Sequence, residues 1–146
     1  MTNNKQQTAV DFVPYEIALE LKQLGFDEPC IAHYTVVPED NINWFTISEQ
    51  AVTDNSSIFG SSKNYNTKWF ETEGTISAPT YSQAFRWFRE KYYVDSYIGF
   101  KKDTDKEFSF YYYQINWTKG FGFETYEEAE LACLKKLIEQ TYGGGE

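Results

Sequence analysis

Three segments of the chain carry apolar residues at helical spacing, which predicts three amphipathic helices. The first covers residues 14–24, beginning at a proline and ending before Gly25. The second begins at Thr80, and the third covers residues 126–141. Each of these two follows a threonine with Gln or Glu three residues later, which is the pattern of a capping box.

The second predicted helix has an apolar stripe and one tryptophan that lies off it. The stripe consists of Tyr81, Ala84, Phe85, Phe88 and Tyr92. Trp87 lies about 120° from this stripe, at about 100° per residue. We therefore expect Trp87 to be exposed or to contact a second element, the alternative being that a loop covers it.

Residues rich in β-branched and aromatic side chains predict the strands. Four strands are expected at residues 31–37, 42–48, 94–101 and 108–117, and a short strand piece or hairpin is expected around Gly74. The glycines at 120 and 122 are interpreted as a flexible link to the last helix.

The strand at 108–117 has two apolar faces, because side chains alternate along a strand. One face holds Phe108, Phe110 and Tyr112, and the other holds Tyr111, Tyr113, Ile115 and Trp117. The stripes of the second and third helices account for one face as core. The other face is expected to be covered by further helices or to meet a partner. The residues predicted to form such a contact surface are Trp87, Tyr111, Tyr113 and Trp117.

The order of these elements is α-β-β-loop-α-β-β-α, which predicts the α+β class: one small, mainly antiparallel sheet packed by helices. A single domain is expected over residues 11–142, with a long polar loop at 49–68. Flexible tails are expected at 1–10 and 143–146. The helix–hairpin unit occurs twice, but without a shared residue pattern, so no true repeat is inferred.

The chain has a net charge of −9, concentrated in its first half. Between Gln23 and Ser62 there is no Lys or Arg. The acidic patch predicted in this half comprises Glu39, Asp40, Glu49 and Asp54. Such a surface repels phosphate backbones, so no nucleic-acid partner is expected. It suits a basic protein partner, or it serves solubility alone.

The sequence offers no constellation typical of catalysis. The only histidine is His33, in an apolar strand, and Cys30 and Cys133 are interpreted as small buried hydrophobes. Glu127 and Glu128 suit the start of a helix. We therefore expect no catalytic residue, no metal and no cofactor. No secretory signal or membrane-spanning run is evident, which favours a soluble cytoplasmic protein.

Two stretches carry a resemblance to known proteins. One is FVPYEIALELKQLGFDEPC at 12–30; the other is ISAPTYSQAFRWFREK at 76–91 together with TYEEAELACLKKLI at 125–138. Together they resemble a family of small uncharacterised proteins of Bacteroidota and their phages, including crAss-like phages. The resemblance implies a mobile-element origin and a bacterial host cytoplasm, or a virion, as the location. It implies no catalytic or binding residue.

Three functions are compatible with these features. The first is a non-enzymatic protein that binds a host or phage protein through exposed aromatics and the acidic half, with an inhibitor of a bacterial immune system as one specific form. The second is a small-molecule or cyclic-nucleotide-signal binding protein that stacks a base in an aromatic pocket. The third is a structural or virion-associated protein that forms a homo-oligomer through the aromatic strand.

Overall fold

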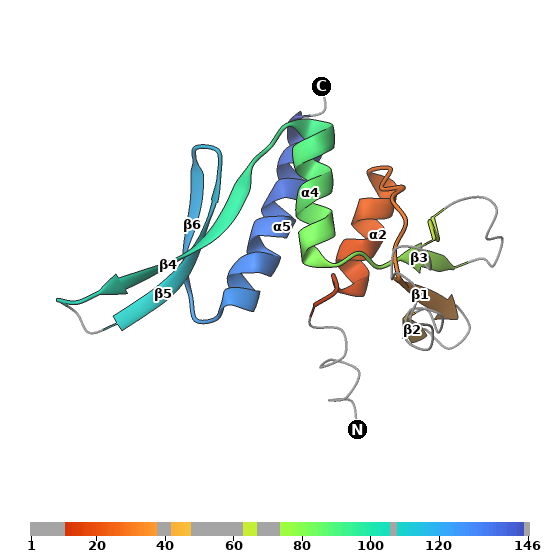
Figure 1. Cartoon of the computed structure of the whole chain (residues 1–146), viewed down its shortest axis with the longest axis horizontal. Helices are drawn as coiled ribbons and strands as arrows, with labels where there is room; N and C mark the ends of the chain where they lie inside the picture. The colour runs from red at the N-terminus through yellow and green to blue at the C-terminus, as the bar shows by residue number, and fades with distance from the viewer. Residues whose placement is uncertain (1–10, 38–41, 48–62, 67–73, 106–107, 145–146) are drawn as a thin grey trace, which may run out of the picture. The chain divides into compact units, whose positions relative to one another are not determined.

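The chain forms two compact units, residues 1–80 (unit 1) and 81–146 (unit 2). The computed structural model describes residues 11–37, 42–47, 63–66, 74–105 and 108–144. The elements confirm the α+β class (Figure 1). The strands form two separate three-stranded antiparallel sheets, one in each unit, rather than the one sheet that the sequence predicts.

Unit 1 is a helix followed by a small sheet. Its elements are α2 (Tyr15–Gln23), β1 (Ala32–Val37), β2 (Ile42–Ile47) and β3 (Thr75–Ser77). The strand order is β2-β1-β3, so the first strand is central. The short strand piece predicted near Gly74 is therefore present as β3, paired to β1.

The end of α2 follows the rule that places glycine just beyond a helix. Gly25 has a φ of 96°, and its N–H donates to the Lys22 carbonyl at 3.0 Å. The Phe26 N–H donates to the Leu21 carbonyl at 2.9 Å. These two bonds form a Schellman motif, which satisfies carbonyls that the helix end leaves open. The motif also turns Phe26 into the core, where it is buried.

Residues 63–66 come from the region predicted as a polar loop, yet they are attached to unit 1. Cys30 and Lys63 exchange two backbone hydrogen bonds, at 2.8 and 2.9 Å. The Asn66 side chain donates to the Phe26 carbonyl and accepts from the Ser77 N–H, both at 3.0 Å. This part of the loop is therefore structural; residues 49–62, 67 and 68 lie outside the described residues.

Unit 2 is a three-stranded sheet flanked in sequence by two helices. Its elements are α4 (Tyr81–Tyr92), β4 (Ser96–Asp103), β5 (Phe108–Ile115), β6 (Thr118–Phe123) and α5 (Tyr126–Gly144). The strand order is β4-β5-β6, so here the second strand is central. This order differs from that of unit 1, which agrees with the absence of a true repeat.

Strand β6 lies where the sequence predicted a flexible link, and that prediction is wrong. Asn116 and Trp117 form a two-residue connection, and Asn116 adopts a φ of 50°, which tight hairpin turns require. Gly122, with a φ of 88°, lies between the residues that pair with Tyr111 and Tyr112, where the register shifts. The glycine is thus the extra residue of a bulge within a strand, and the chain continues to pair.

Helix α5 supplies the core of unit 2. The Glu128 N–H donates to the Thr125 hydroxyl at 3.1 Å, which confirms the predicted cap. The buried residues of α5 form the broad apolar arc that the sequence predicts: Ala129, Cys133, Leu134, Leu137 and Ile138. The helix continues to Gly144, so the predicted tail at 143–146 is wrong for its first two residues.

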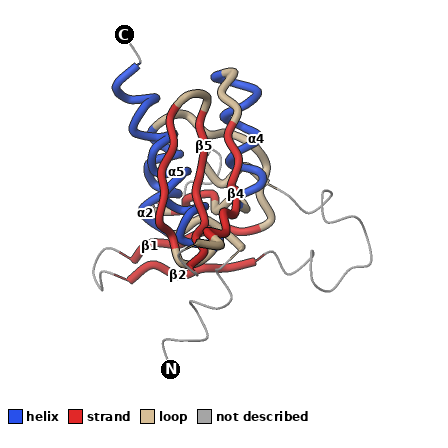
Figure 2. Tube along the Cα trace, turned by 90° about the vertical axis from the view of Figure 1, so that its left-hand side faces the viewer, coloured by secondary structure: helices blue, strands red, loops and turns tan. Residues whose placement is uncertain are grey.

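Both helices of unit 2 lie on the same side of its sheet. Helix α5 contacts all three strands, and α4 packs beside α5 (Figure 1). Figure 2 looks onto the opposite face of the sheet, where no described helix or strand of unit 2 lies. A three-stranded sheet with helices on one face therefore leaves its second face open.

His33 packs within unit 1 with one ring nitrogen buried and without a hydrogen bond to any described residue. Its ring stacks on Tyr65 with centroids 4.2 Å apart, and within the described part of the chain its buried Nδ1 has no hydrogen-bond partner. Burial lowers the pKa of His33 below its ordinary value of 6.5. The native protein therefore binds fewer protons at this site than the unfolded chain does near pH 6.

We expect the stability of the protein to fall as the pH drops below about 6.5, since a depressed histidine pKa favours unfolding wherever the unfolded state takes up the proton. His33→Phe keeps a stacking ring and removes the titrating group. Thermal unfolding of both proteins between pH 8 and pH 5.5 measures the effect. His33 is the only histidine, so equal slopes in the two proteins would contradict the assignment.

Candidate functional site: an open aromatic sheet face

Cross-strand register in unit 2 assigns each side chain to one of the two sheet faces. Tyr113 pairs with Ile98 and Tyr111 pairs with Phe100. The Tyr111 ring also lies edge-on to Tyr126 of α5, with centroids 6.1 Å apart, so this is the face that α5 covers. Because side chains alternate along a strand, the neighbours of these residues must lie on the open face.

The open face carries five aromatic rings from all three strands, which we call the aromatic face. They are Tyr97, Phe108, Phe110, Tyr112 and Phe121. Consecutive centroids along the chain of rings Phe108–Phe110–Phe121–Tyr112–Tyr97 are 5.9, 6.1, 5.9 and 6.1 Å apart. These distances are within the range of direct aromatic contact, so the rings form one continuous surface.

Much of the aromatic face is accessible to solvent. Phe121, Tyr97 and Phe108 are 57%, 51% and 47% exposed. Apolar rings in such numbers on one face are more than scattered surface hydrophobics, which are normal in globular proteins. The face is therefore a candidate contact surface.

Polar groups complete one end of the aromatic face. The Tyr97 hydroxyl donates to Gln114 Oε1 at 2.6 Å, and Gln114 Nε2 donates to the Asn116 carbonyl at 2.9 Å. Lys119 lies opposite Gln114 on β6, and Lys101 lies opposite Phe110 on β4. The face thus carries two ammonium groups beside its rings, although the whole chain is acidic.

A glycine allows Tyr112 to lie across the sheet. A Cβ atom added at Gly99 would overlap the Tyr112 ring, so the ring occupies the space above the glycine on the neighbouring strand. The same arrangement occurs on the helix-covered face, where Tyr113 lies over Gly120. A ring packed over a cross-strand glycine compensates for the missing side chain and fixes strand register.

Trp117 is the most exposed of the large apolar side chains described, with 97% of its surface accessible. It lies in the two-residue connection between β5 and β6, directly between Asn116 and Thr118. The Asn116 N–H donates to the Asp95 carbonyl at 3.2 Å, which ties this turn to the segment before β4. Trp117 is therefore accessible to a partner, and its role in a contact surface stays a prediction.

Of the alternatives given for Trp87, exposure is wrong, because only 4% of its surface is accessible, whereas burial by other parts of the chain remains. Its ring lies edge-on to Phe88 and Tyr92, at 5.1 and 5.5 Å, and the Lys91 ammonium lies 4.9 Å from its centroid. Trp87 follows the buried Ala84 by three residues and so shares its side of the helix. Compared with the stripe predicted from the sequence, the buried side of α4 is therefore shifted around the helix toward Trp87.

Tyr111 and Tyr113, the other two predicted contact residues, lie on the helix-covered face. Tyr113 is buried and Tyr111 is half-buried, in contact with Phe100 at 4.9 Å. The structure therefore brings Trp87, Tyr111 and Tyr113 into packing contacts and leaves only Trp117 freely accessible. The opposite face of β5, which the sequence had not selected, is the open one.

The acidic patch and the two cysteines are the other groups that the sequence singles out. The acidic patch Glu39, Asp40, Glu49 and Asp54 lies outside that part. Cys30 and Cys133 are buried free thiols, as expected, and burial raises the pKa of Cys133 to about 12. No three His, Cys, Asp or Glu side chains among the described residues are grouped to hold a metal ion.

Comparison with protein-family models, with curated proteins and with solved structures found no match. Within the described ranges, none of the helices has the length and apolar character needed to cross a bilayer. The site must therefore be interpreted from its own geometry.

We expect Gly99→Ala to destabilise the protein by about 1–3 kcal/mol, because the new methyl group displaces the Tyr112 ring. In a Tyr112→Ala background the same change should cost little, giving a coupling energy of about 0.5 kcal/mol or more. Urea denaturation of the single and double variants measures this coupling.

Gly143→Ala is the matched control, since a Cβ at Gly143 meets nothing within 4 Å. Alanine in a helix is more stable than glycine, so this variant should lose no stability. Strictly additive effects of Gly99→Ala and Tyr112→Ala would show that the ring does not depend on the glycine.

Proposed function

We propose that this chain is a non-enzymatic binding protein of phage or mobile-element origin that engages a host or phage protein through the aromatic face and Trp117. The observation that carries the proposal is the open sheet face itself, with five rings in contact and no described element of unit 2 over them. Aromatic anchors in contact surfaces contribute most of the binding energy in protein complexes.

The charges beside the rings specify the partner's chemistry. Lys101 and Lys119 lie on the open face, and Asp103 lies at its far end, opposite Phe108. The Asp103 carboxylate accepts a hydrogen bond from the Asp105 N–H at 3.1 Å, so it is engaged in the turn. The complementary surface is an apolar patch with carboxylates at its rim.

Contacts within the face favour binding without large reorganisation. Tyr112 is held over Gly99, and Tyr97 is held by Gln114. Side chains that already hold their bound conformation in the free protein lose less conformational entropy when a partner binds. An inhibitor of a bacterial immune system is one specific form of this function, consistent with the resemblance of the sequence to phage proteins.

The test is a pull-down from a Bacteroidota lysate, followed by affinity measurement with the identified partner. We expect Phe121→Ala and Trp117→Ala each to weaken binding at least tenfold, since anchor residues cost about 2 kcal/mol or more when truncated. Lys101→Glu should slow association and reduce its salt dependence.

Trp44→Ala is the matched control, because Trp44 is a 46% exposed tryptophan in unit 1. Circular dichroism and thermal unfolding of every variant establish that it is folded. Partner binding that Trp44→Ala weakens and that Phe121→Ala and Trp117→Ala leave intact would contradict the proposal. A dimer in light scattering that Phe121→Ala dissociates would instead assign the face to a second copy of the chain.

A further inference from the structure

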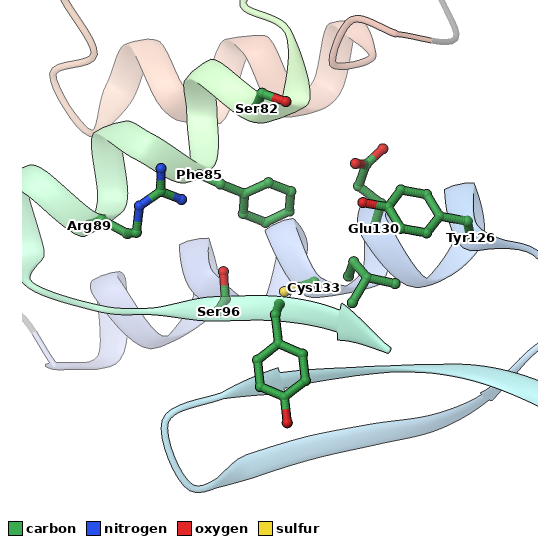
Figure 3. Close-up of a pocket in the computed structure, with 9 residues that line it drawn as sticks. Ser82, Phe85, Arg89, Ser96, Tyr126, Glu130 and Cys133 are labelled. Atoms are coloured by element: carbon green, nitrogen blue, oxygen red, sulfur yellow. The ribbon is translucent and has the colours of Figure 1, made fainter. Parts of the chain in front are cut away.

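A pocket of about 340 Å³ lies on the other side of the same sheet, between α4, α5 and β4 (Figure 3). Helix α4 contributes Ser82, Phe85 and Arg89, and α5 contributes Tyr126 and Glu130. The α4 residues are separated by three and four positions, so they share one face of the helix. The volume is at the lower end of the range typical of small-ligand sites, about 300–1,000 Å³.

The polar groups of the pocket are separated by an aromatic ring. In Figure 3 the Phe85 ring lies between the Arg89 guanidinium at one end and Tyr126 with Glu130 at the other. Arg89 is exposed and forms no ion pair with a described residue. The guanidinium therefore remains available to an anion.

At the opposite end of the pocket, Tyr126 and Glu130 offer a hydrogen-bond donor and an acceptor, and the described residues of the lining there include no activated nucleophile. Desolvation by burial and the neighbouring Glu130 carboxylate raise the pKa of Tyr126, so its hydroxyl stays protonated. The Cys133 thiol in the lining is held neutral by burial, with a pKa of about 12. A neutral thiol is a poor nucleophile, which favours binding over covalent chemistry.

We propose that this pocket binds a purine nucleoside monophosphate that carries an exocyclic amine. The phosphate pairs with Arg89, the base packs on Phe85 and Tyr126, and the amine donates to Glu130. A single guanidinium matches one phosphate group. An aromatic amino acid fits less well, because its carboxylate and ammonium group are on the same carbon, whereas Arg89 and Glu130 lie on either side of the Phe85 ring.

This inference does not rest on the aromatic face, with which the pocket shares only Tyr97. It uses the helix-covered side, where Ser96 and Ile98 of β4 line the pocket. Loss of nucleotide binding would therefore leave the partner-binding proposal intact, and the reverse also holds.

Isothermal titration of the full chain with adenosine monophosphate, adenosine and inosine monophosphate tests the assignment. We expect adenosine monophosphate to bind most tightly. Arg89→Gln should weaken it by about tenfold or more, the usual effect of losing a charge-assisted hydrogen bond, while changing adenosine binding little. Glu130→Gln should reduce the preference for adenosine monophosphate over inosine monophosphate. A carboxylate can only accept a hydrogen bond from the adenine amine, whereas an amide can also donate one to the carbonyl group of hypoxanthine.

Arg86→Gln is the matched control, since Arg86 is exposed on the same helix and does not line the pocket. Equal losses in Arg86→Gln and Arg89→Gln would show non-specific attraction and overturn the proposal. Absence of heat with all three compounds at millimolar concentration, or binding of tryptophan in preference to adenosine monophosphate, would also overturn it.

Discussion

The packing of α5 on one face of the β4-β5-β6 sheet is the contact on which the rest of unit 2 depends. The buried arc of α5 includes Cys133, Leu134 and Leu137, and it lies against the side of β5 that holds Tyr113 and Ile115. Since strand side chains alternate strictly, burying these two residues directs Phe110 and Tyr112 to the other side. The open aromatic face is thus a direct consequence of how the core is made.

Glycines and rings complement each other on both faces of this sheet. Tyr112 lies over Gly99 on the open face, and Tyr113 lies over Gly120 on the covered face. A glycine in a strand normally weakens it, because it offers no side chain to its neighbours. Here the neighbouring tyrosine supplies that contact at Gly99 and at Gly120, while the second glycine of β6, Gly122, is taken up by the bulge.

Local signals in the sequence predicted the elements that depend on local physics. The helices, the cap at Thr125 and the glycine stop at Gly25 depend on neighbouring residues, and the structure confirms them. The sequence also shows that β5 has two apolar faces. Which face α5 would cover depends on contacts between residues far apart in the chain, and periodicity alone cannot decide that. The alternatives for Trp87 stayed open for a related reason, because its burial depends on which side of α4 faces the core.

Strand β6 was missed because its two glycines were interpreted as a flexible link. The signal was present as alternation: Lys119 and Phe121 fall on one face, and Gly120 lies opposite Tyr113 on the other. With β6 in place, Phe121 joins the rings of β5, and the aromatic face extends across three strands instead of two.

The net charge of the chain is a poor guide to the chemistry of this face. Eleven of the acidic residues and only four of the basic ones are in residues 1–75, whereas unit 2 is nearly balanced. On the aromatic face the ammonium groups of Lys101 and Lys119 lie beside the rings, and Asp103 is tied into its turn. Screening limits the reach of distant charges to about 10 Å at moderate ionic strength. A partner that docks on this face therefore meets rings with two ammonium groups and, at the far end, the Asp103 carboxylate. Its affinity is set by those groups more than by the acidity of the chain as a whole.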